Sequence, residues 1–397
     1  MTTRLIVLLA LSTPSLAADA ITWRSAATGG DVRGQVHTPQ DSPAKLPTVV
    51  YLTNLSVPRI ATEPSDAIVA DLVASGHLVL VLYYAKHASA SSPALNADLL
   101  KLREDIASKA KSLLAEYPAD PDRLFILPEG FRLRRDVEFA RDGKRVLAMD
   151  VAYPSKPAKP VPLLMEITCD NVNRMGSGSL LFCRDTLLEG GAIAGFAVAM
   201  VDHPVAPPYK GIDDPMPQCL HRMKAAVRTL RAMSDEIGTS GKVGAIGFSR
   251  GGPFAAMLAL TNGRADLEDD GAHRGVSSAV QAALIHGNRY DYLNLRPDDP
   301  MLARFEKAWG PRNANERRWA EHGAAHYLTR DAAPMFLNTS DAESAEYRDG
   351  LAKFDARLTE LSVEHVYQVD ADGRGHRVTT DSKTLANVYE FFGKHLK

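Results

Sequence analysis

One short stretch constrains this chain more than any other part of it. An apolar run that ends in Gly-x-Ser-x-Gly, Val243-Gly-Ala-Ile-Gly-Phe-Ser249-Arg-Gly-Gly252, is followed by the helix-forming run Phe254-Ala-Ala-Met-Leu-Ala-Leu260. This order predicts a strand, a tight turn and a helix whose N-terminus points at the serine. A serine hydroxyl is a weak nucleophile that needs a nearby base and N–H groups for the developing oxyanion. Ser249 at such a turn is therefore a candidate nucleophile.

The partners that such a serine needs follow in the chain. The candidate base is His376, in the glycine-rich Asp372-Gly-Arg-Gly-His376 after the strand-like residues 364–370. The acid is expected after the strand Pro334-Met-Phe-Leu-Asn338, where Asp341 and Glu343 compete. An isolated Gly-x-Ser-x-Gly is more often an ordinary turn, and most of the twelve histidines are surface or core residues. The order serine, acid, histidine nevertheless agrees with an α/β-hydrolase rather than with chymotrypsin or subtilisin.

The chain is long enough for more than one unit. Its 397 residues exceed the roughly 250 at which a single core usually stops growing. Residues 21–129 and the residues from 133 onward share one predicted order, a hairpin followed by buried apolar strands and a helix. The first copy stops at Leu127-Pro-Glu-Gly130, where an elbow serine would stand. We therefore expect a truncated, degenerate hydrolase-like half at 21–129 and a catalytic domain at 130–397. The exposed edge and apolar face of the half should pack on the second copy or on a partner chain.

A long insertion follows the strand that comes after the elbow. Residues 287–333 hold six aromatic residues among many charges, and they are longer than an ordinary connection. Their aromatic rings are candidates for stacking on a sugar or phenolic ring. A small separate core under the insertion is the favoured explanation for most of them.

The first residues read as an export signal. A basic start at Arg4, the apolar run Leu5-Ile-Val-Leu-Leu-Ala-Leu11 and small residues up to Ala20 fit a signal peptide, with cleavage after Ala17 or Ala20. No later run reaches the roughly 18 apolar residues of a membrane-spanning helix. We therefore expect residues 1–20 to be removed and the protein to be periplasmic or secreted.

Net charge and cysteine content limit the classes of binding partner that we expect. A formal net charge of -2 gives no electrostatic case for nucleic acid or an anionic membrane surface. Three cysteines, Cys169, Cys183 and Cys219, have no metal-site spacing. They leave open one disulfide or buried free thiols. No cofactor or metal is expected, and the expected partners are a small-molecule or polysaccharide-linked ester and, as a candidate, a second copy in a homodimer.

From about Leu133 to its end the chain resembles the α/β-hydrolase superfamily. Within it, the resemblance is to secreted acetyl-esterase and feruloyl-esterase-like enzymes related to dienelactone hydrolase and prolyl oligopeptidase. The opening hairpin at 136–154, the elbow, Ala325-His-Tyr-Leu-Thr-Arg-Asp-Ala-Ala-Pro334 and Gly373-Arg-Gly-His376 carry it. The resemblance implies an α/β-hydrolase fold with a mostly parallel central sheet. It also implies Ser249 as nucleophile, His376 as general base and the Arg250 N–H as an oxyanion donor.

Two stretches depart from the family pattern. Many relatives carry His-Gly-Gly after the first central strand, where this chain has Thr168-Cys-Asp170. The backbone N–H of Cys169 or Asp170 is the candidate second oxyanion donor. The acid also departs, because an ungapped count from Pro334 reaches Glu343, whereas the commoner residue type, Asp341, requires a shorter turn. The sequence slightly favours Asp341.

These features predict a secreted serine carboxylic-ester hydrolase that acts on acetyl, feruloyl or similar esters of carbohydrates. A serine peptidase of the prolyl-oligopeptidase type is an alternative, although residues 21–129 do not show the repeated blades of a propeller. A non-catalytic binding protein with a hydrolase fold is a second alternative, suggested by the unusual oxyanion stretch.

Overall fold

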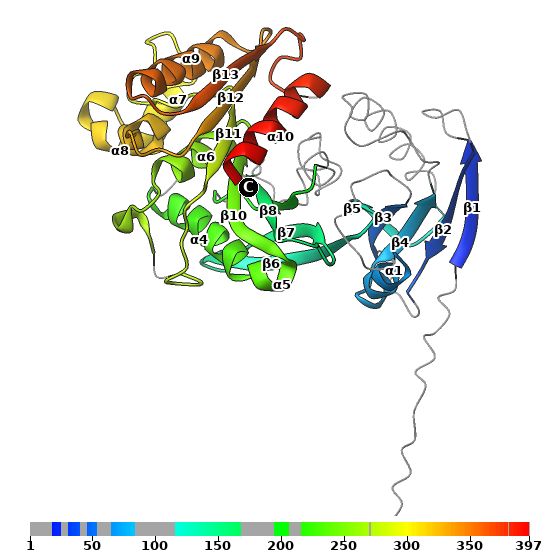
Figure 1. The fold of residues 1–397 in the computed structure, drawn as a ribbon. Helices are drawn as coiled ribbons and strands as arrows, with labels where there is room; N and C mark the ends of the chain where they lie inside the picture. The colour runs from blue at the N-terminus through cyan, green and yellow to red at the C-terminus, as the bar shows by residue number, and fades with distance from the viewer. Residues whose placement is uncertain are drawn as a thin grey trace, which may run out of the picture.

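The computed structural model describes two sheets joined by one continuous run of chain (Figure 1). It describes residues 18–24, 31–39, 46–53, 65–83, 116–167, 194–205, 216–269, 271–379 and 381–396. The expected signal peptide, Cys169, Asp170 and Cys183 lie wholly or largely outside these residues. Cys219 lies within them and is buried.

The larger sheet carries the elbow. Its strands run in the order β13-β12-β11-β10-β8-β9-β7-β6. The bounds are β6 Phe131–Asp142, β7 Arg145–Pro154, β8 Val161–Ile167, β9 Ala197–Val201, β10 Thr239–Gly247, β11 Ala282–His286, β12 Met335–Ser340 and β13 His365–Asp370. Only the β6–β7 and β7–β9 pairs are antiparallel, so the expected mostly parallel sheet is confirmed. Every residue of β8, β9 and β11 is buried, as their continuous apolar runs require in a sheet covered on both faces.

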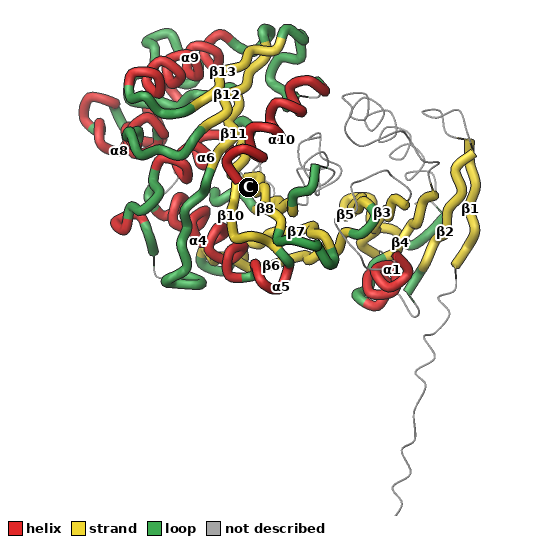
Figure 2. The backbone as a smooth tube through the Cα atoms, in the orientation of Figure 1, coloured by secondary structure: helices red, strands yellow, loops and turns green. Residues whose placement is uncertain are grey.

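Helices cover both faces of this sheet (Figures 1 and 2). Helices α4 (Gln218–Ala232), α6 (Gly251–Leu260) and α9 (Ala345–Glu360) share one apolar core with one face. Helix α10 (Ser382–Leu396) packs on β10 and β11 from the opposite face. The short α5 (Ser234–Ile237) and the 3-10 turn η1 (Ala265–Leu267) complete this part of the chain. Among the described residues, no helix is both long and apolar enough to cross a membrane.

The smaller sheet repeats the topology of half of the larger one. Its order is β1-β2-β4-β3-β5, with bounds β1 Ala18–Arg24, β2 Asp31–His37, β3 Leu46–Thr53, β4 Leu78–Tyr83 and β5 Ala119–Pro128. Strand for strand this is the order β6-β7-β9-β8-β10, and the parallel and antiparallel pairings are the same. Helix α1 (Ser65–Ala74) connects β3 and β4. This agreement supports the interpretation of residues 21–129 as a truncated copy.

The two sheets meet around the turn where the copy stops. After β5 the chain turns at Glu129-Gly130 and enters β6, and the Gly130 N–H donates to the Tyr51 hydroxyl at 2.8 Å. Arg132 of β6 pairs with Asp71 of α1. One cluster of buried apolar side chains runs from the smaller sheet through Phe131 to the α10 side of the larger sheet. The apolar face of the smaller sheet is therefore covered, at least in part, by the rest of the same chain.

The insertion after β11 contains four short helical segments and has its own core. It contains α7 (Leu302–Trp309), η2 (Arg312–Ala314), α8 (Glu316–His322) and η3 (Ala324–Tyr327). Phe305, Trp309 and Trp319 form a separate buried cluster, while Tyr290 and Tyr327 join the main core. Most of the aromatic residues of the insertion are therefore core residues, as favoured from the sequence.

Candidate active site

The elbow is a sharp reversal between β10 and α6. Ser249 has a φ of +49°, a left-handed conformation that is uncommon for a residue with a side chain. The Gly251 N–H donates to the carbonyl of Phe248 at 2.8 Å, and the Gly252 N–H donates to the carbonyl of Ser249 at 3.0 Å. These two bonds close the turn and carry the chain directly into α6. Ser249 thus stands at the carboxyl end of β10, where parallel α/β sheets commonly hold their reacting groups.

Two glycines make the reversal sterically accessible. A Cβ on Gly247 would lie 2.3 Å from the carbonyl oxygen of Gly251. A Cβ on Gly252 would lie 2.7 Å from the hydroxyl of Tyr290. Both distances are shorter than nonbonded contacts allow, so these positions exclude any larger residue. The sequence singled out Gly247 and Gly251, and the structure adds Gly252.

Ser249, His376 and Glu343 form one hydrogen-bonded row. The Nε2 of His376 lies 2.9 Å from the Oγ of Ser249, and its Nδ1 lies 2.7 Å from the Oε2 of Glu343. Glu343 follows β12 and His376 follows β13, so all three side chains meet beyond the same edge of the sheet. The carboxylate of Glu343 is buried, whereas the imidazole is 33% exposed, so a substrate can reach the histidine but not the acid.

Asp341, the acid that the sequence favoured, does not contact the histidine in the structure. Its carboxylate accepts the Gly373 N–H at 3.0 Å, and this bond is the main reason that the pKa of Asp341 is lowered. The physical reason for the difference is the length of β12. This strand continues to Ser340, so Asp341 comes too early to reach the imidazole, and two residues later the longer Glu343 side chain turns inward.

The loop that carries His376 is held by the ion pairs of Arg374, a residue that the sequence did not indicate as part of the site. Gly373 and Gly375 have φ values of +63° and +65°, which favour glycine. Between them, the side chain of Arg374 turns inward and pairs with Asp370 and Asp372. This contact fixes the loop, and the Gly-Arg-Gly pattern was its only signal in the sequence.

The residues directly after β11 touch the nucleophile and the acid. We refer to residues 286–290, the last residue of β11 and the four that follow it, as the strap. The amide of Asn288 donates to the carbonyl oxygen of Ser249. A Cβ on Gly287 would lie 3.3 Å from the Oε2 of Glu343, so the glycine lets the carboxylate pack against the backbone. The strap therefore lies between the two ends of the row.

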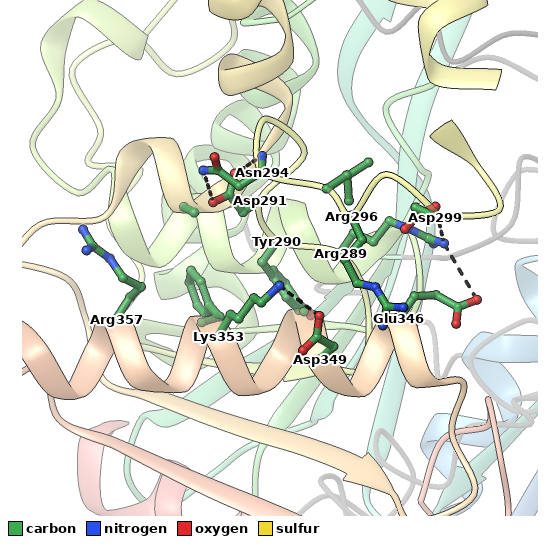
Figure 3. Close-up of a pocket in the computed structure, with 14 residues that line it drawn as sticks. Arg289, Tyr290, Asp291, Asn294, Arg296, Asp299, Glu346, Asp349, Lys353 and Arg357 are labelled. Carbon is green, nitrogen blue, oxygen red and sulfur yellow. Dashed lines mark hydrogen bonds and ion pairs between the residues drawn. The ribbon is translucent and has the colours of Figure 1, made fainter. Parts of the chain in front are cut away.

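The strap also reaches the histidine indirectly. The guanidinium of Arg289 forms two hydrogen bonds with the buried Asp299, at 2.7 and 2.9 Å. Its Cζ lies 4.8 Å from the ring centroid of Tyr347, and the Tyr347 ring lies 4.7 Å from the ring of His376. Figure 3 shows a second pocket, which is lined by Arg289, Asp299 and Glu346 among other residues. Arg289 thus anchors a ring that packs on the imidazole.

A cavity of about 360 Å³ adjoins this row. Arg250, Asn288 and Tyr347 line it on the side of the row, and Tyr292, Phe305 and Trp309 line it from the insertion. Aromatic faces and guanidinium groups together suit a flat ring that carries hydroxyl groups. The insertion therefore supplies one wall of a cavity next to the row.

Of the expected oxyanion donors, the N–H of Arg250 lies among the described residues. Arg250 is the residue before the first turn of α6, so its N–H stands at the positive end of that helix next to Ser249. The candidates for the second donor, Cys169 and Asp170, lie outside the described residues. Among the residues that the structure describes, no group of His, Cys, Asp and Glu is arranged to hold a metal ion.

Two buried histidines near the site predict how stability depends on pH. Burial, with Arg250 adding to it, lowers the pKa of His203 from 6.5 to about 3, and burial with Arg374 does the same for His286. Between these values the unfolded chain binds protons that the folded chain does not, so stability falls as the pH drops below 6.5. We expect each histidine to lower the free energy of unfolding by about 2 kcal/mol at pH 5 relative to pH 7.

Urea unfolding at pH 7 and pH 5 measures this loss. In His203→Gln and His286→Gln the difference between the two pH values should shrink, whereas His273→Gln, at an exposed position, should keep the wild-type difference. An unchanged difference in both buried variants would contradict the assignment.

Comparisons with known proteins agree with this fold. Residues 149–344 match the model of the BD-FAE family, an α/β-hydrolase-type esterase family. A comparison with curated protein sequences gives no match.

Several solved structures share the fold. A bifunctional GH43-CE protein of Bacteroides eggerthii has a TM-score of 0.54 and 20% identity, covering 67% of this chain and 38% of that one. A truncated carbohydrate esterase from gut microbiota has a TM-score of 0.52 and 17% identity, covering 66% of this chain and 95% of that one. An acetyl ester-xyloside bifunctional hydrolase from Caldicellulosiruptor lactoaceticus has a TM-score of 0.52 and 15% identity, covering 68% of this chain and 97% of that one.

Proposed function

We propose that this carboxylic ester hydrolase, an α/β-hydrolase-type esterase, cleaves acyl esters of carbohydrates with Ser249 as its nucleophile. The observation that carries the proposal is the row of Ser249, His376 and Glu343, with separations of 2.9 and 2.7 Å. This is the arrangement in which a base removes the serine proton while an acid orients the base.

Each member of the row has one task in this mechanism. The Nδ1–H of His376 donates to Glu343, which leaves the Nε2 lone pair facing the Ser249 hydroxyl. Ser249 attacks the ester carbonyl as its proton passes to His376, and the Arg250 N–H stabilises the oxyanion. His376 then protonates the leaving alcohol, and the acyl group remains on Ser249. Water, activated by the same imidazole, releases the acid and restores the serine.

The carbohydrate assignment is supported by the cavity and by the relatives. The half-buried ring of Tyr292 can contact a sugar ring, and Arg250 can donate to hydroxyl or acyl oxygens. Two similar structures are described as a carbohydrate esterase and an acetyl ester-xyloside hydrolase. Acetyl, feruloyl and similar acyl groups are the proposed acyl class.

The same proposal includes export. Residues 1–17 have the composition of a signal peptide, which would bring the enzyme to polysaccharides outside the cytoplasm. Strand β1 starts at Ala18 and pairs with β2 from that residue on. Cleavage after Ala17 would leave β1 whole, whereas cleavage after Ala20 would remove its first residues.

A substrate panel tests the function. The purified protein should release acetate from acetylated xylo-oligosaccharides and hydrolyse methyl ferulate or 4-nitrophenyl acetate, and it should leave a proline-containing peptide anilide intact. Acetate release is measured by an enzymatic assay, and the anilide by absorbance. Turnover of the anilide without any ester would support the peptidase alternative. Hydrolysis of simple aryl esters without any sugar ester would remove the carbohydrate assignment and leave an esterase.

A further inference from the structure

The strap contains an amide whose placement goes beyond the three residues of the row. Asn288 is 5% exposed, and its Nδ2 donates to the carbonyl oxygen of Ser249. That carbonyl also accepts the Gly252 N–H at 3.0 Å, so the Asn288 amide is a second, side-chain tie on the residue that carries the nucleophile. No other side-chain donor to this carbonyl occurs among the hydrogen bonds of the described residues.

The orientation of the amide is determined by its other end. The Oδ1 of Asn288 accepts the N–H of Arg289 at 2.7 Å. If the amide were flipped, an NH₂ group would face this N–H and the Oδ1 would face the carbonyl of Ser249, with donors and acceptors opposed at both ends. The observed orientation satisfies both contacts, so the amide is a defined donor toward Ser249.

The strap is held in place by one contact within itself and by two contacts with other parts of the chain. Arg289 is anchored to the buried Asp299. The hydroxyl of Tyr290 donates to the carbonyl of His286, which closes the strap on itself. Helix α9 packs on it so closely that a Cβ on Gly350 would lie 2.6 Å from the carbonyl oxygen of Asn288. The amide therefore extends from a rigid base to the elbow.

The elbow needs such a tie because its conformation is unfavourable. A residue with a side chain at a φ of +49° is held there only when its surroundings impose that conformation. The bond from Asn288 acts on the peptide unit of Ser249 itself. Its loss would let the peptide rotate and move the Oγ away from the Nε2 of His376, where it now lies at 2.9 Å.

From these contacts we infer that Asn288 is a positioning residue for the nucleophile, holding Ser249 in its left-handed conformation through the hydrogen bond to its carbonyl. The inference rests on the proposed function, because it assumes Ser249 as the reacting group. It deepens that function by making the first residues of the insertion part of the machinery that aligns the serine with the histidine.

Substitutions of Asn288 can test whether its hydrogen bond to Ser249 or only its volume matters. Asn288→Asp keeps the size and shape of the side chain but removes the donor, whereas Asn288→Ala removes both. We expect kcat for 4-nitrophenyl acetate to fall by about 10- to 100-fold in both variants, with KM changing by less than about threefold. Asn288→Leu fills a similar volume without a donor or a charge. If Asn288 only fills space, Asn288→Leu should behave like the wild type and Asn288→Ala should not, whereas the inference predicts a similar loss in both. Asn294→Asp adds the same charge at an exposed position of the insertion and should leave kcat unchanged.

The rate at which a fluorophosphonate labels Ser249 provides a readout that needs no turnover. In this reaction the serine oxygen bonds to phosphorus as fluoride leaves, so the rate reports on the alignment of Ser249 with His376. Labelling should slow by a similar factor in all three Asn288 variants, at a temperature where circular dichroism shows them folded. Labelling at the wild-type rate in any folded variant of the three would overturn the inference and leave the esterase proposal standing. If the wild type is not labelled at all, Ser249 is not the nucleophile and both proposals fail.

Discussion

The Ser249→Ala variant is expected to lose at least about 10⁴-fold in kcat for 4-nitrophenyl acetate. Alanine removes the only atom that can form the acyl-enzyme, while the oxyanion donors and the substrate cavity remain. The residual rate should therefore reflect electrostatic stabilisation of direct attack by water, which is small compared with covalent catalysis. Initial rates over a range of substrate concentrations give kcat and KM for both proteins.

The control for this variant is its fold. Alanine and serine are similarly unfavourable at the left-handed φ of this position, so the thermal midpoint should change little. KM should also stay near the wild-type value, because the cavity beside the elbow is unchanged. A folded Ser249→Ala protein that keeps more than about a hundredth of the wild-type kcat would contradict the nucleophile assignment, since triad serines contribute far more than that.

A second large loss of activity should show which carboxylate, Glu343 or Asp341, orients His376. We expect Glu343→Gln to lower kcat by about 10³- to 10⁴-fold. The amide cannot stabilise the imidazolium, and its NH₂ can turn toward the Nδ1 and disfavour the tautomer in which His376 accepts the serine proton. Asp341→Asn is the matched control and should change kcat by less than about threefold, because that side chain bonds to Gly373 and not to the imidazole.

The pair is measured under identical conditions, with kcat and the thermal midpoint recorded for each variant. Loss of activity in Asp341→Asn together with a nearly active Glu343→Gln would reverse the assignment. Equal losses in both would show that Asp341 acts on catalysis through the loop that it shares with His376. The sequence slightly favoured Asp341, so it would have predicted an inactive Asp341→Asn variant and a nearly active Glu343→Gln variant.

Much of the fold could be read from the sequence because its signals are local. The buried strands β8 and β11 are apolar except for Glu166 and His286, a composition typical of a sheet covered on both faces. The elbow has a strand before it and a helix after it, so its geometry follows from neighbouring residues. The repeated order of hairpin and strands likewise required only a comparison of the chain with itself.

The details of the site depended on contacts between distant residues. Asp341 and Glu343 differ by two positions in one turn, and only the end of β12 at Ser340 decides which carboxylate faces His376. Asn288 gave no catalytic signal, because its partner is the backbone carbonyl of Ser249, far away in sequence. Arg374 gave none either, because its ion pairs with Asp370 and Asp372 depend on how the loop after β13 turns. The orientation of one side chain in a turn follows from three-dimensional packing, which hydrophobic patterns do not encode.

The strap has a consequence for protein engineering. Insertions after this strand are attractive targets for grafting, since they form one wall of the substrate cavity and look like separable units. Here the graft boundary would pass through residues that also hold Ser249 and support the ring on His376. A chimera joined after Tyr290 would exchange the cavity wall alone only if it kept Asp299, which anchors Arg289, together with Tyr347 and Gly350 of α9. A chimera joined at β11 would exchange the alignment of the nucleophile as well, so altered selectivity would come with an altered turnover number.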